Sequence, residues 1–273
     1  MSGEFAGKVV VITGGSRGIG REIAVDFAKA GAQTVIVSSS AENLAAASKT
    51  IAAAGGPAPL AINTDLRKLD GCQQAFNTVK EKFNRCDVLV NSAGATKAGN
   101  FVELPDEAWM DGYALKLFGC VRMCRLFWPM LKAANGFVVN IGGGAARSPG
   151  ADFAIGASVN AAMGNFSKAL SQLGKKDGVN VNVIHPGATE TERFYQLIEQ
   201  RSKASGKSIE ELKKEATAKD GLRRLGKSED ISALTLFLCS EKARHIQGTA
   251  IAVDGGLSSS HPVTKQEYGK TAH

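Results

Sequence analysis

A glycine-rich turn near the N-terminus is the first feature of this sequence that predicts chemistry. Residues 13–20 read Thr-Gly-Gly-Ser-Arg-Gly-Ile-Gly and lie between a short apolar run and a helical pattern. Small residues let the backbone approach a pyrophosphate, and the free N–H groups and dipole of the helix favour its negative charge. Glycines also form tight turns that bind nothing, so the position between strand and helix carries the prediction of nucleotide binding. The predicted contact residues are Gly14, Ser16, Arg17, Gly18, Ile19 and Gly20.

Serines end the second predicted strand, where the ribose of a dinucleotide would lie. An acidic residue at that point binds the ribose 2′-hydroxyl and repels a 2′-phosphate. Here the residues are Ser38, Ser39 and Ser40, without a carboxylate, and Arg17 supplies a cation nearby. Hydroxyl donors and a guanidinium suit a phosphate, which favours NADP(H) over NAD(H). Serines at a strand end also form turns without any ligand.

The elements that would position these residues alternate between short β-branched runs and longer helical stretches. Buried-type strands are predicted at residues 8–13, 34–37, 59–63, 87–91, 137–141, 179–184 and 249–253. Helices are predicted at residues 19–30, 43–54, 70–84, 105–133, 153–175 and 228–239. Near-continuous apolar strands alternating with helices predict an α/β fold, a doubly wound parallel sheet of Rossmann type.

Two segments interrupt this alternation. Residues 188–226 are polar, basic and helical in pattern, and we expect them to form a lid-like insertion in a single domain of residues 1–257. The alternative is a solvated helical surface. Residues 258–273 are predicted to be a tail that is disordered or packed against a neighbouring subunit.

Further motifs follow the glycine-rich turn in a fixed order. They are Asp65-Leu66, Asn91-Ser92-Ala93-Gly94, the segment of residues 185–191 that contains Pro186-Gly187, and the closing stretches Gln247-Gly248 and Val253-Asp254-Gly255-Gly256. Any one of them is weak evidence, but the ordered set resembles the short-chain dehydrogenase/reductase family over about residues 5–256.

This resemblance implies further cofactor contacts and an assembly. Asp65 and Leu66 would flank the adenine ring, and Asn91, Ala93 and Gly94 would shape the end of the fourth strand beside the cofactor. The contacts implied at the nicotinamide end are Pro186, Gly187, Thr189 and Thr191. The family also implies a homo-oligomer, a tetramer or dimer paired through the helices at residues 105–133 and 153–175.

The chain departs from this family at the catalytic residues. Members typically use a Ser, a Tyr-x-x-x-Lys pair and an Asn, in which the Tyr hydroxyl supplies the proton that neutralises the developing alkoxide. None of the three tyrosines here (Tyr113, Tyr195 and Tyr268) has Lys four residues later. Register from residues 138–141 places Gly143 at the Ser position, Gly156 at the Tyr position, Asn160 at the Lys position and Lys116 at the Asn position.

Lys116 and Asn160 thus look like an exchange that would keep a cation in the site. A lysine beside an oxidised nicotinamide and partly desolvated should have a pKa lowered toward neutrality, which suits a proton donor. The alternative is drift after loss of activity, with Lys116 extending to solvent. Asp152 could pass a proton through water or could cap a helix, and His185 is interpreted as a strand-end residue. The glycines at residues 142–144 and at Gly156 are expected to enlarge the cavity.

Composition limits the remaining functions. Apolar runs are too short to span a membrane and no secretory signal is present, so we expect a cytoplasmic protein. The net charge of +7 is concentrated in residues 199–227, which could attract an anionic cofactor or substrate. Nucleic acid is not the expected partner because interleaved aromatic residues are missing. Cys120 and Cys124 share a helix face, but without a histidine nearby they predict buried thiols and no metal site.

Two functions therefore remain open, with nucleic-acid binding as a distant third. The first is an NADP(H)-dependent oxidoreductase with an unusual proton donor, acting on a carbonyl, an alcohol or a conjugated C=C bond of a small molecule. The second is a nucleotide-binding protein that has lost catalysis and serves as a sensor or partner subunit. Turnover of NADPH that depends on Lys116 would distinguish them.

Overall fold

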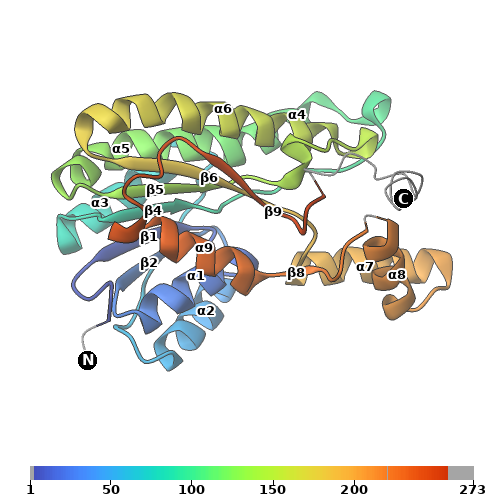
Figure 1. Ribbon diagram of the computed structural model, residues 1–273, viewed down its shortest axis with the longest axis horizontal. Helices are drawn as coiled ribbons and strands as arrows, with labels where there is room; N and C mark the ends of the chain where they lie inside the picture. The colour runs from blue at the N-terminus through green and yellow to red at the C-terminus, as the bar shows by residue number, and fades with distance from the viewer. Residues whose placement is uncertain (1–2, 220, 258–273) are drawn as a thin grey trace, which may run out of the picture.

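A seven-stranded parallel sheet forms the centre of the protein in the computed structural model, which describes residues 3–219 and 221–257 (Figure 1). The strand order is β3-β2-β1-β4-β5-β6-β9, and every neighbouring pair is parallel. The strands are β1 Val9–Thr13, β2 Gln33–Ser38, β3 Leu60–Asn63, β4 Val88–Asn91, β5 Phe137–Ile141, β6 Asn180–Pro186 and β9 Ala250–Val253. This arrangement confirms the predicted doubly wound α/β fold.

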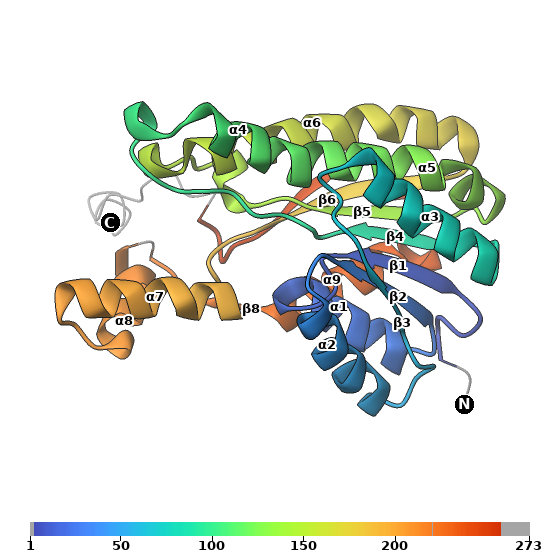
Figure 2. The same cartoon turned by 180° about the vertical axis from the view of Figure 1, so that it is seen from behind.

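Helices cover both faces of the sheet. Figures 1 and 2 show α1, α2 and α9 against one face and α3, α5 and α6 against the other, with α4 near the end of that second layer. The helices are α1 Gly18–Lys29, α2 Ala41–Ala53, α3 Leu69–Phe83, α4 Asp106–Tyr113, α5 Gly119–Ala133, α6 Ala154–Asp177, α7 Glu192–Ser205, α8 Ile209–Lys219 and α9 Ser228–Leu238. Short 3-10 turns lie at Phe101–Glu103, Gly144–Ala146, Ala151–Phe153 and Glu241–Ala243. No helix in the described ranges is long and apolar enough to cross a membrane.

The strand sequences explain why the sheet is central. All residues of β1, β4 and β5 are buried, because these strands have helices on both sides and carry apolar side chains in both directions. One core lies around Ile23, Phe27 and Ile36, and the other around Met123, Phe127 and Leu89. Since strand order reverses between β1 and β4, a crevice opens at their carboxyl ends.

The long helix predicted at residues 105–133 is interrupted. It divides into α4, a π-helical segment η2 at Ala114–Phe118, and α5. One extra residue in a turn rotates the side chains that follow it, and such π segments are frequent at functional sites. Lys116 lies inside this segment, which the pattern of apolar residues did not reveal.

The insertion between β6 and α9 is helical, as its composition predicted. It contains α7 and α8, flanked by two-residue strands β7 Thr189–Glu190 and β8 Gly226–Lys227 that pair with each other. Figure 2 shows α7 and α8 projecting beyond the carboxyl edge of the sheet. The predicted tail at residues 258–273 lies outside the described residues.

Candidate active site

The turn after β1 has the close packing that a phosphate-binding backbone needs. Gly14 has a φ of +67°, and a Cβ at this position would lie 2.8 Å from Ala93. A Cβ on Gly20 would lie 2.3 Å from the carbonyl oxygen of Gly14. The hydroxyl of Thr13 accepts hydrogen bonds from the backbone N–H groups of Ser92 and Ala93, both at 3.1 Å. Only glycine fits at 14 and 20, so the turn lies directly against the end of β4.

The N-terminus of α1 already binds an anionic group of the protein. The N–H of Gly18 donates to a carboxylate oxygen of Glu192 at 2.9 Å, and Arg21 forms an ion pair with the same carboxylate at 2.7 Å. Glu192 is the first residue of α7, so it comes from the insertion. The helix end has free donors and a favourable dipole, and a carboxylate uses them as a phosphate would. The residues therefore fit the pyrophosphate of a dinucleotide.

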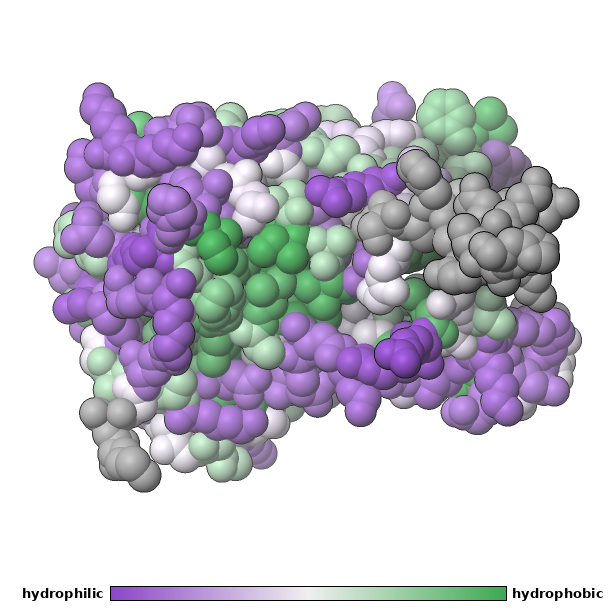
Figure 3. Space-filling model, in the orientation of Figure 1, coloured by the Kyte–Doolittle hydropathy of each residue, from purple (hydrophilic) through white to green (hydrophobic). Residues whose placement is uncertain are grey.

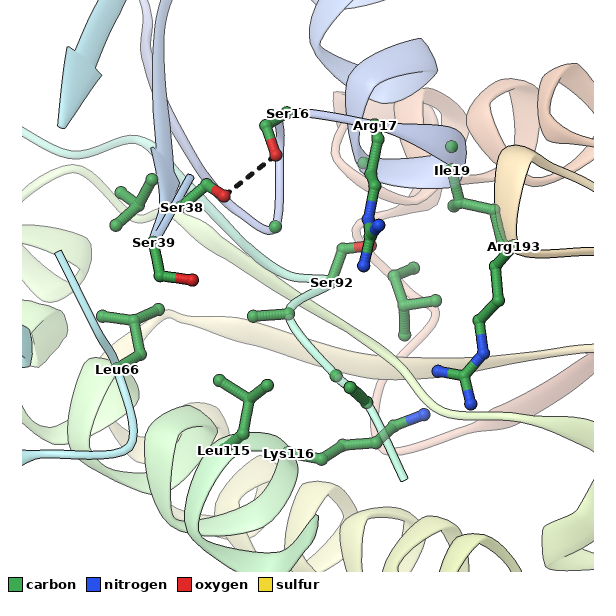
Figure 4. A pocket seen from close by; sticks show the side chains of 18 of the residues that line it. Ser16, Arg17, Ile19, Ser38, Ser39, Leu66, Ser92, Leu115, Lys116 and Arg193 are labelled. Atoms are coloured by element: carbon green, nitrogen blue, oxygen red, sulfur yellow. Dashed lines mark hydrogen bonds between the residues drawn. The ribbon is translucent and has the colours of Figure 1, made fainter. Parts of the chain in front are cut away.

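Hydroxyl groups line the far end of the crevice, and two arginines lie elsewhere along its wall. Ser16 Oγ donates to Ser38 Oγ at 2.9 Å, and Ser39 beside it is exposed. Figure 4 shows the side chain of Arg17 directed into the middle of the pocket, on the side away from both serines. The guanidinium of Arg67 is paired with Asp65 and Asp111. No carboxylate follows Ser38 directly, and the prediction of NADP(H) rests on this absence.

The structure brings most of the predicted cofactor residues together in this crevice. They are Gly14, Ser16, Arg17, Gly18, Ile19, Gly20, Ser38, Ser39, Asp65, Leu66, Ala93, Gly94 and Thr191. Pro186, Gly187 and Thr189 line an adjoining pocket, which we call the inner pocket, and Thr191 lines both. Asn91 lines neither. It is buried, and its Nδ2 donates to Asn140 Oδ1 at 2.9 Å, so it holds the ends of β4 and β5 together.

Lys116 lies at the junction of the crevice and the inner pocket. Its aliphatic chain passes over Gly94, where a Cβ would lie 2.8 Å from Lys116 Cδ. Its Nζ donates to the carbonyl oxygen of Gly142 at 2.9 Å. Burial, with a contribution from the positive charge of Arg193, lowers the pKa of Lys116 to about 8. The ammonium therefore points into the site, and its proton is labile near neutral pH.

Asn160 and Phe153 fill the space beside two of the predicted catalytic positions. A Cβ on Gly143 would lie 2.6 Å from Asn160 Nδ2, and a Cβ on Gly156 would lie 2.1 Å from the ring of Phe153. The buried Oδ1 of Asn160 has no hydrogen-bond partner among the described residues. The expectation that these two glycines enlarge the cavity is wrong, because neighbouring side chains occupy the vacated volume. Gly143 and Asn160 line the inner pocket and Gly156 does not.

The other candidate proton carriers lie outside the reach of the two pockets or already have a partner. His185 is buried on β6, and its Nδ1 accepts the N–H of Gly143 at 3.2 Å. Burial, then the charges of Arg147 and Lys116, lower the pKa of His185. Asp152 is exposed in a 3-10 turn and lines neither pocket, and α6 begins after Phe153 with no side-chain cap. Strand-end packing is therefore the role that the structure gives His185.

Arg193 is a site residue that sequence reasoning did not identify. It lines both pockets, and its guanidinium donates to the carbonyl oxygen of Thr96 at 2.8 Å. Desolvation and the nearby charge of Arg17 lower its pKa. No motif marks it, since it is one of many basic residues in the insertion. Its only sequence signal is its position two residues after Thr191.

The cysteine pair is part of a buried polar network. Cys120 Sγ lies 3.3 Å from Asn140 Oδ1, and Cys124 Sγ accepts from Asn91 Nδ2 at 3.3 Å. A hydrogen bond with Cys124, and then burial, raise the pKa of Cys120. Over the ranges that the structure describes, no group of three His, Cys, Asp or Glu side chains is placed to hold a metal ion.

Comparison with known proteins places this crevice in a family. Fold and crevice together define a dinucleotide-binding α/β protein. Residues 8–202 match the family model described as short chain dehydrogenase. The 3-oxoacyl-[acyl-carrier-protein] reductase of Chlamydia trachomatis is 32% identical over 261 residues, covering 94% of this chain and all of that protein. The chain therefore belongs to the short-chain dehydrogenase/reductase family and is an NAD(P)-dependent oxidoreductase.

Other relatives show the range of the family around this chain. The 3beta-hydroxysteroid dehydrogenase of Mediterraneibacter gnavus is 30% identical, with 94% of this chain and 97% of that protein covered. The L-sorbose reductase of Gluconobacter frateurii, solved with NADPH and L-sorbose, superposes with a TM-score of 0.91 at 30% identity. Its alignment covers 95% of this chain and all of that one. These relatives act on chemically different substrates, so the family alone assigns none here.

Proposed function

We propose that this protein is an NADP(H)-dependent oxidoreductase in which Lys116 replaces the missing tyrosine as proton donor. The reaction is transfer of hydride to or from a carbonyl, an alcohol or a conjugated C=C bond of a small molecule. One observation carries the proposal: the Lys116 ammonium lies where the crevice meets the inner pocket, bound to the Gly142 carbonyl at 2.9 Å. The bound dinucleotide would supply or accept the hydride.

Lys116 can hold and move the proton that such a reaction needs. Charge builds on the substrate oxygen as hydride reaches the carbonyl carbon, and an ammonium stabilises that charge before donating its proton. With a pKa of about 8, the proton is available at neutral pH, and the amine can regain one from water. General acid catalysis of this kind contributes about 10²–10⁴ in rate. The Gly142 carbonyl keeps the amine directed into the site.

Preference for NADP(H) is supported by the end of β2 and by the solved relatives. Ser16 and Ser38 present hydroxyls without a carboxylate at that strand end, and Arg17 lies in the same crevice. The L-sorbose reductase and the actinorhodin polyketide ketoreductase, the latter 27% identical with a TM-score of 0.88, were both solved with NADPH. A 2′-phosphate would gain charge-assisted hydrogen bonds here that NAD(H) cannot make.

The proposal extends to the surroundings of the enzyme. A small-molecule substrate with anionic character fits a site lined by Lys116 and Arg193, and the basic insertion acts as a lid that favours anions. We also propose a cytoplasmic homo-oligomer, a tetramer or dimer, paired through α4, α5 and α6. Exposed Phe101, Val102, Met110 and Phe118 on or beside α4 and η2 support pairing on that side.

The deciding experiment measures NADPH oxidation over a panel of ketones, aldehydes and enones with the wild type and Lys116→Ala. We expect turnover by the wild type and a loss of about 10²–10⁴ in kcat for the variant, with NADPH binding retained. Lys97→Ala removes an exposed lysine that lines neither pocket, and it should match the wild type. Binding of NADPH without turnover of any substrate would instead support a sensor or partner subunit.

A further inference from the structure

Two cationic side chains converge at the boundary of the inner pocket. Lys116 from η2 and Arg193 from α7 both line this pocket and the crevice beside it. Figure 4 shows the ammonium and the guanidinium directed toward one another. The hydrogen bonds that they donate within the described chain go to the backbone carbonyls of Gly142 and Thr96. Neither has a carboxylate partner among the ion pairs that the described residues form.

This pair is electrostatically unfavourable as it stands. The charge of Arg193 contributes to the lowered pKa of Lys116, and the charge of Arg17 contributes to that of Arg193. Arg193 is exposed and Lys116 is half-buried, so solvent screens part of their mutual repulsion, and a bound anion would replace it with attraction to both cations. The geometry therefore favours a ligand with negative charge near both heads.

A buried amide on the wall of the same pocket indicates a polar ligand. Asn160 is 3% exposed, its Oδ1 has no partner among the described residues, and its Nδ2 faces Gly143. Leaving such a group unpaired costs about 1–3 kcal/mol, so a protein retains it where a ligand or water completes the contacts. Lys116, Arg193 and Asn160 thus come from three different elements to line one pocket.

We propose that the inner pocket binds a short oxo acid, or the matching hydroxy acid, with its carboxylate on Arg193 and its reacting oxygen at Lys116. A guanidinium binds a carboxylate through two parallel hydrogen bonds and fixes its orientation. Because both cations line the same pocket, one short acid can present its carboxylate to Arg193 and its reacting oxygen to Lys116, and 2-oxo and 3-oxo acids are the two lengths to compare. This assignment of the reacting oxygen rests on the proposed function, whereas the carboxylate site on Arg193 does not.

The kinetic test compares acids with their neutral esters. Pyruvate and acetoacetate are assayed against their methyl esters as substrates for NADPH oxidation by the full-length protein. The acid-to-ester ratio of kcat/KM, compared between variants, cancels the intrinsic reactivity of each carbonyl. We expect this ratio to fall by roughly 100-fold in Arg193→Ala and by roughly 10-fold in Arg193→Lys, which keeps the charge and loses the fork. Affinity for NADPH is measured for each variant as well, because Arg193 also lines the cofactor crevice.

Lys203→Ala is the matched control, because Lys203 is an exposed cation on the same helix and lines neither pocket. It removes the same charge from the insertion, so an unchanged acid-to-ester ratio in this variant assigns the effect to local binding. An equal decrease of the acid-to-ester ratio in Lys203→Ala would show that the electrostatic field of the whole insertion attracts the acid. That result would overturn the proposed carboxylate site on Arg193.

An equilibrium arm separates this inference from the proposed function. Oxamate, an oxo-acid analogue whose amide carbonyl resists reduction, is titrated into the NADPH-loaded protein by calorimetry. Oxamate binding that disappears in Arg193→Ala, without turnover of any acid, would retain the carboxylate site and reject the reductase. Reduction of neutral ketones with no preference for acids would do the reverse. Weaker NADPH binding in Arg193→Ala with an unchanged acid-to-ester ratio would assign Arg193 to the cofactor and overturn the inference.

Discussion

As the proposed proton donor, Lys116 would make the rate of the reaction depend on pH. Its pKa is lowered to about 8 by burial and by Arg193, while Cys120 counteracts the shift. The pKa of the buried His185 beside the site is lowered as well, so His185 does not change its charge near pH 8. Reduction requires the protonated amine, so kcat for NADPH-dependent reduction should be constant below about pH 7 and fall tenfold per pH unit above about 8. Oxidation of the alcohol should show the opposite slope.

The measurement is a pair of pH profiles, one in each direction, between pH 6 and 10. Tris-free buffers of constant ionic strength keep the charge of Arg193 equally screened at each point. Profiles with no inflection in this range, or with an inflection that persists in Lys116→Ala, would remove Lys116 from the proton transfer.

Ser38 is the residue at which we expect the proposed preference for NADP(H) to be reversed. Ser38→Asp would place a carboxylate at the end of β2, where Ser38 Oγ now accepts from Ser16 at 2.9 Å. We expect affinity for NADPH to fall at least about tenfold and affinity for NADH to rise, as a carboxylate repels a 2′-phosphate and accepts from a 2′-hydroxyl. Fluorescence titration with both dinucleotides measures this.

Ser40→Asp is the matched control for that change. Ser40 caps α2 by accepting the N–H of Asn43 at 3.2 Å, and it is not part of the crevice wall. Asp caps helices as well as Ser does, so this variant adds the same charge without harming the helix. Equal effects of the two substitutions would indicate a general electrostatic response and no contact with the 2′-position.

Individual site residues were predictable where a backbone requirement fixed their type or where register against a family pattern fixed their position. Gly14 and Gly20 follow from the sequence because no other residue fits the turn. Lys116 and Asn160 were located through register against a family pattern, and the structure places both in the lining of one pocket. The ring of Phe153 beside Gly156 could not be foreseen, since it depends on a side-chain orientation that no spacing encodes.

At the scale of elements, α7 contacts α1 through a carboxylate that we expect to compete with the pyrophosphate of the cofactor. Glu192 accepts the N–H of Gly18 at 2.9 Å and pairs with Arg21, so its carboxylate occupies the donors that a pyrophosphate would use. Glu192→Gln removes the negative charge while keeping the size of the side chain. We expect NADPH to bind about 3–10-fold more tightly to this variant, because less electrostatic work is needed to displace the side chain.

Calorimetry with NADPH at two salt concentrations tests this contact, with Glu199→Gln as the control. Glu199 is exposed on the same helix and has the same charge, but it lies outside both pockets. Weaker NADPH binding in Glu192→Gln would mean that the carboxylate instead stabilises the bound state by holding α7 against α1.

Elements with strong periodicity were predicted well, and local irregularities were not. The strands of the central sheet agree with their predicted ranges to within about two residues at each end, because buried parallel strands are continuous apolar runs. The π segment at Ala114–Phe118 was missed because its residues have an ordinary helical composition. The pairing of β7 with β8 brings together residues about 37 positions apart with no apolar pattern, which local sequence cannot specify.

Across the whole molecule, the cofactor crevice and the buried contacts of Asp87 lie at opposite edges of the sheet. The crevice lies at the carboxyl ends of the strands, as the switch in strand order between β1 and β4 requires. The amino ends of the same two strands are joined by Asp87, which is 3% exposed. Its Oδ2 accepts the N–H of Val9 at 2.9 Å and Nε of Arg85 at 2.7 Å, and Lys8 lies 3.3 Å from its Oδ1.

This separation predicts a substitution that weakens the fold and leaves the site unchanged. Burial raises the pKa of Asp87. The hydrogen bonds from Arg85 and Val9 and the charges of Arg85 and Lys8 lower it by more than burial raises it, so the pKa is below its ordinary value. Asp87→Asn should lower the free energy of unfolding by about 1–3 kcal/mol at pH 7, because the hydrogen bonds from Arg85 and Val9 lose a charged acceptor, while both cations remain exposed to solvent. NADPH affinity should not change. Asp70→Asn, at an exposed carboxylate, should change the unfolding free energy by less than about 1 kcal/mol.

The pH dependence of that difference identifies its origin. A carboxyl group whose pKa is lowered in the folded state contributes its full stability above the unfolded pKa of about 3.9 and loses it as the pH falls through the folded pKa. Urea unfolding at pH 7, 5, 4 and 3 should therefore show the gap between wild type and Asp87→Asn constant down to about pH 5 and narrowing below about 4. If the difference in unfolding free energy between wild type and Asp87→Asn stays constant to pH 3, the destabilisation comes from altered packing. Only the contacts of the ionised carboxylate, which connect β1 and β4, make a contribution that depends on pH.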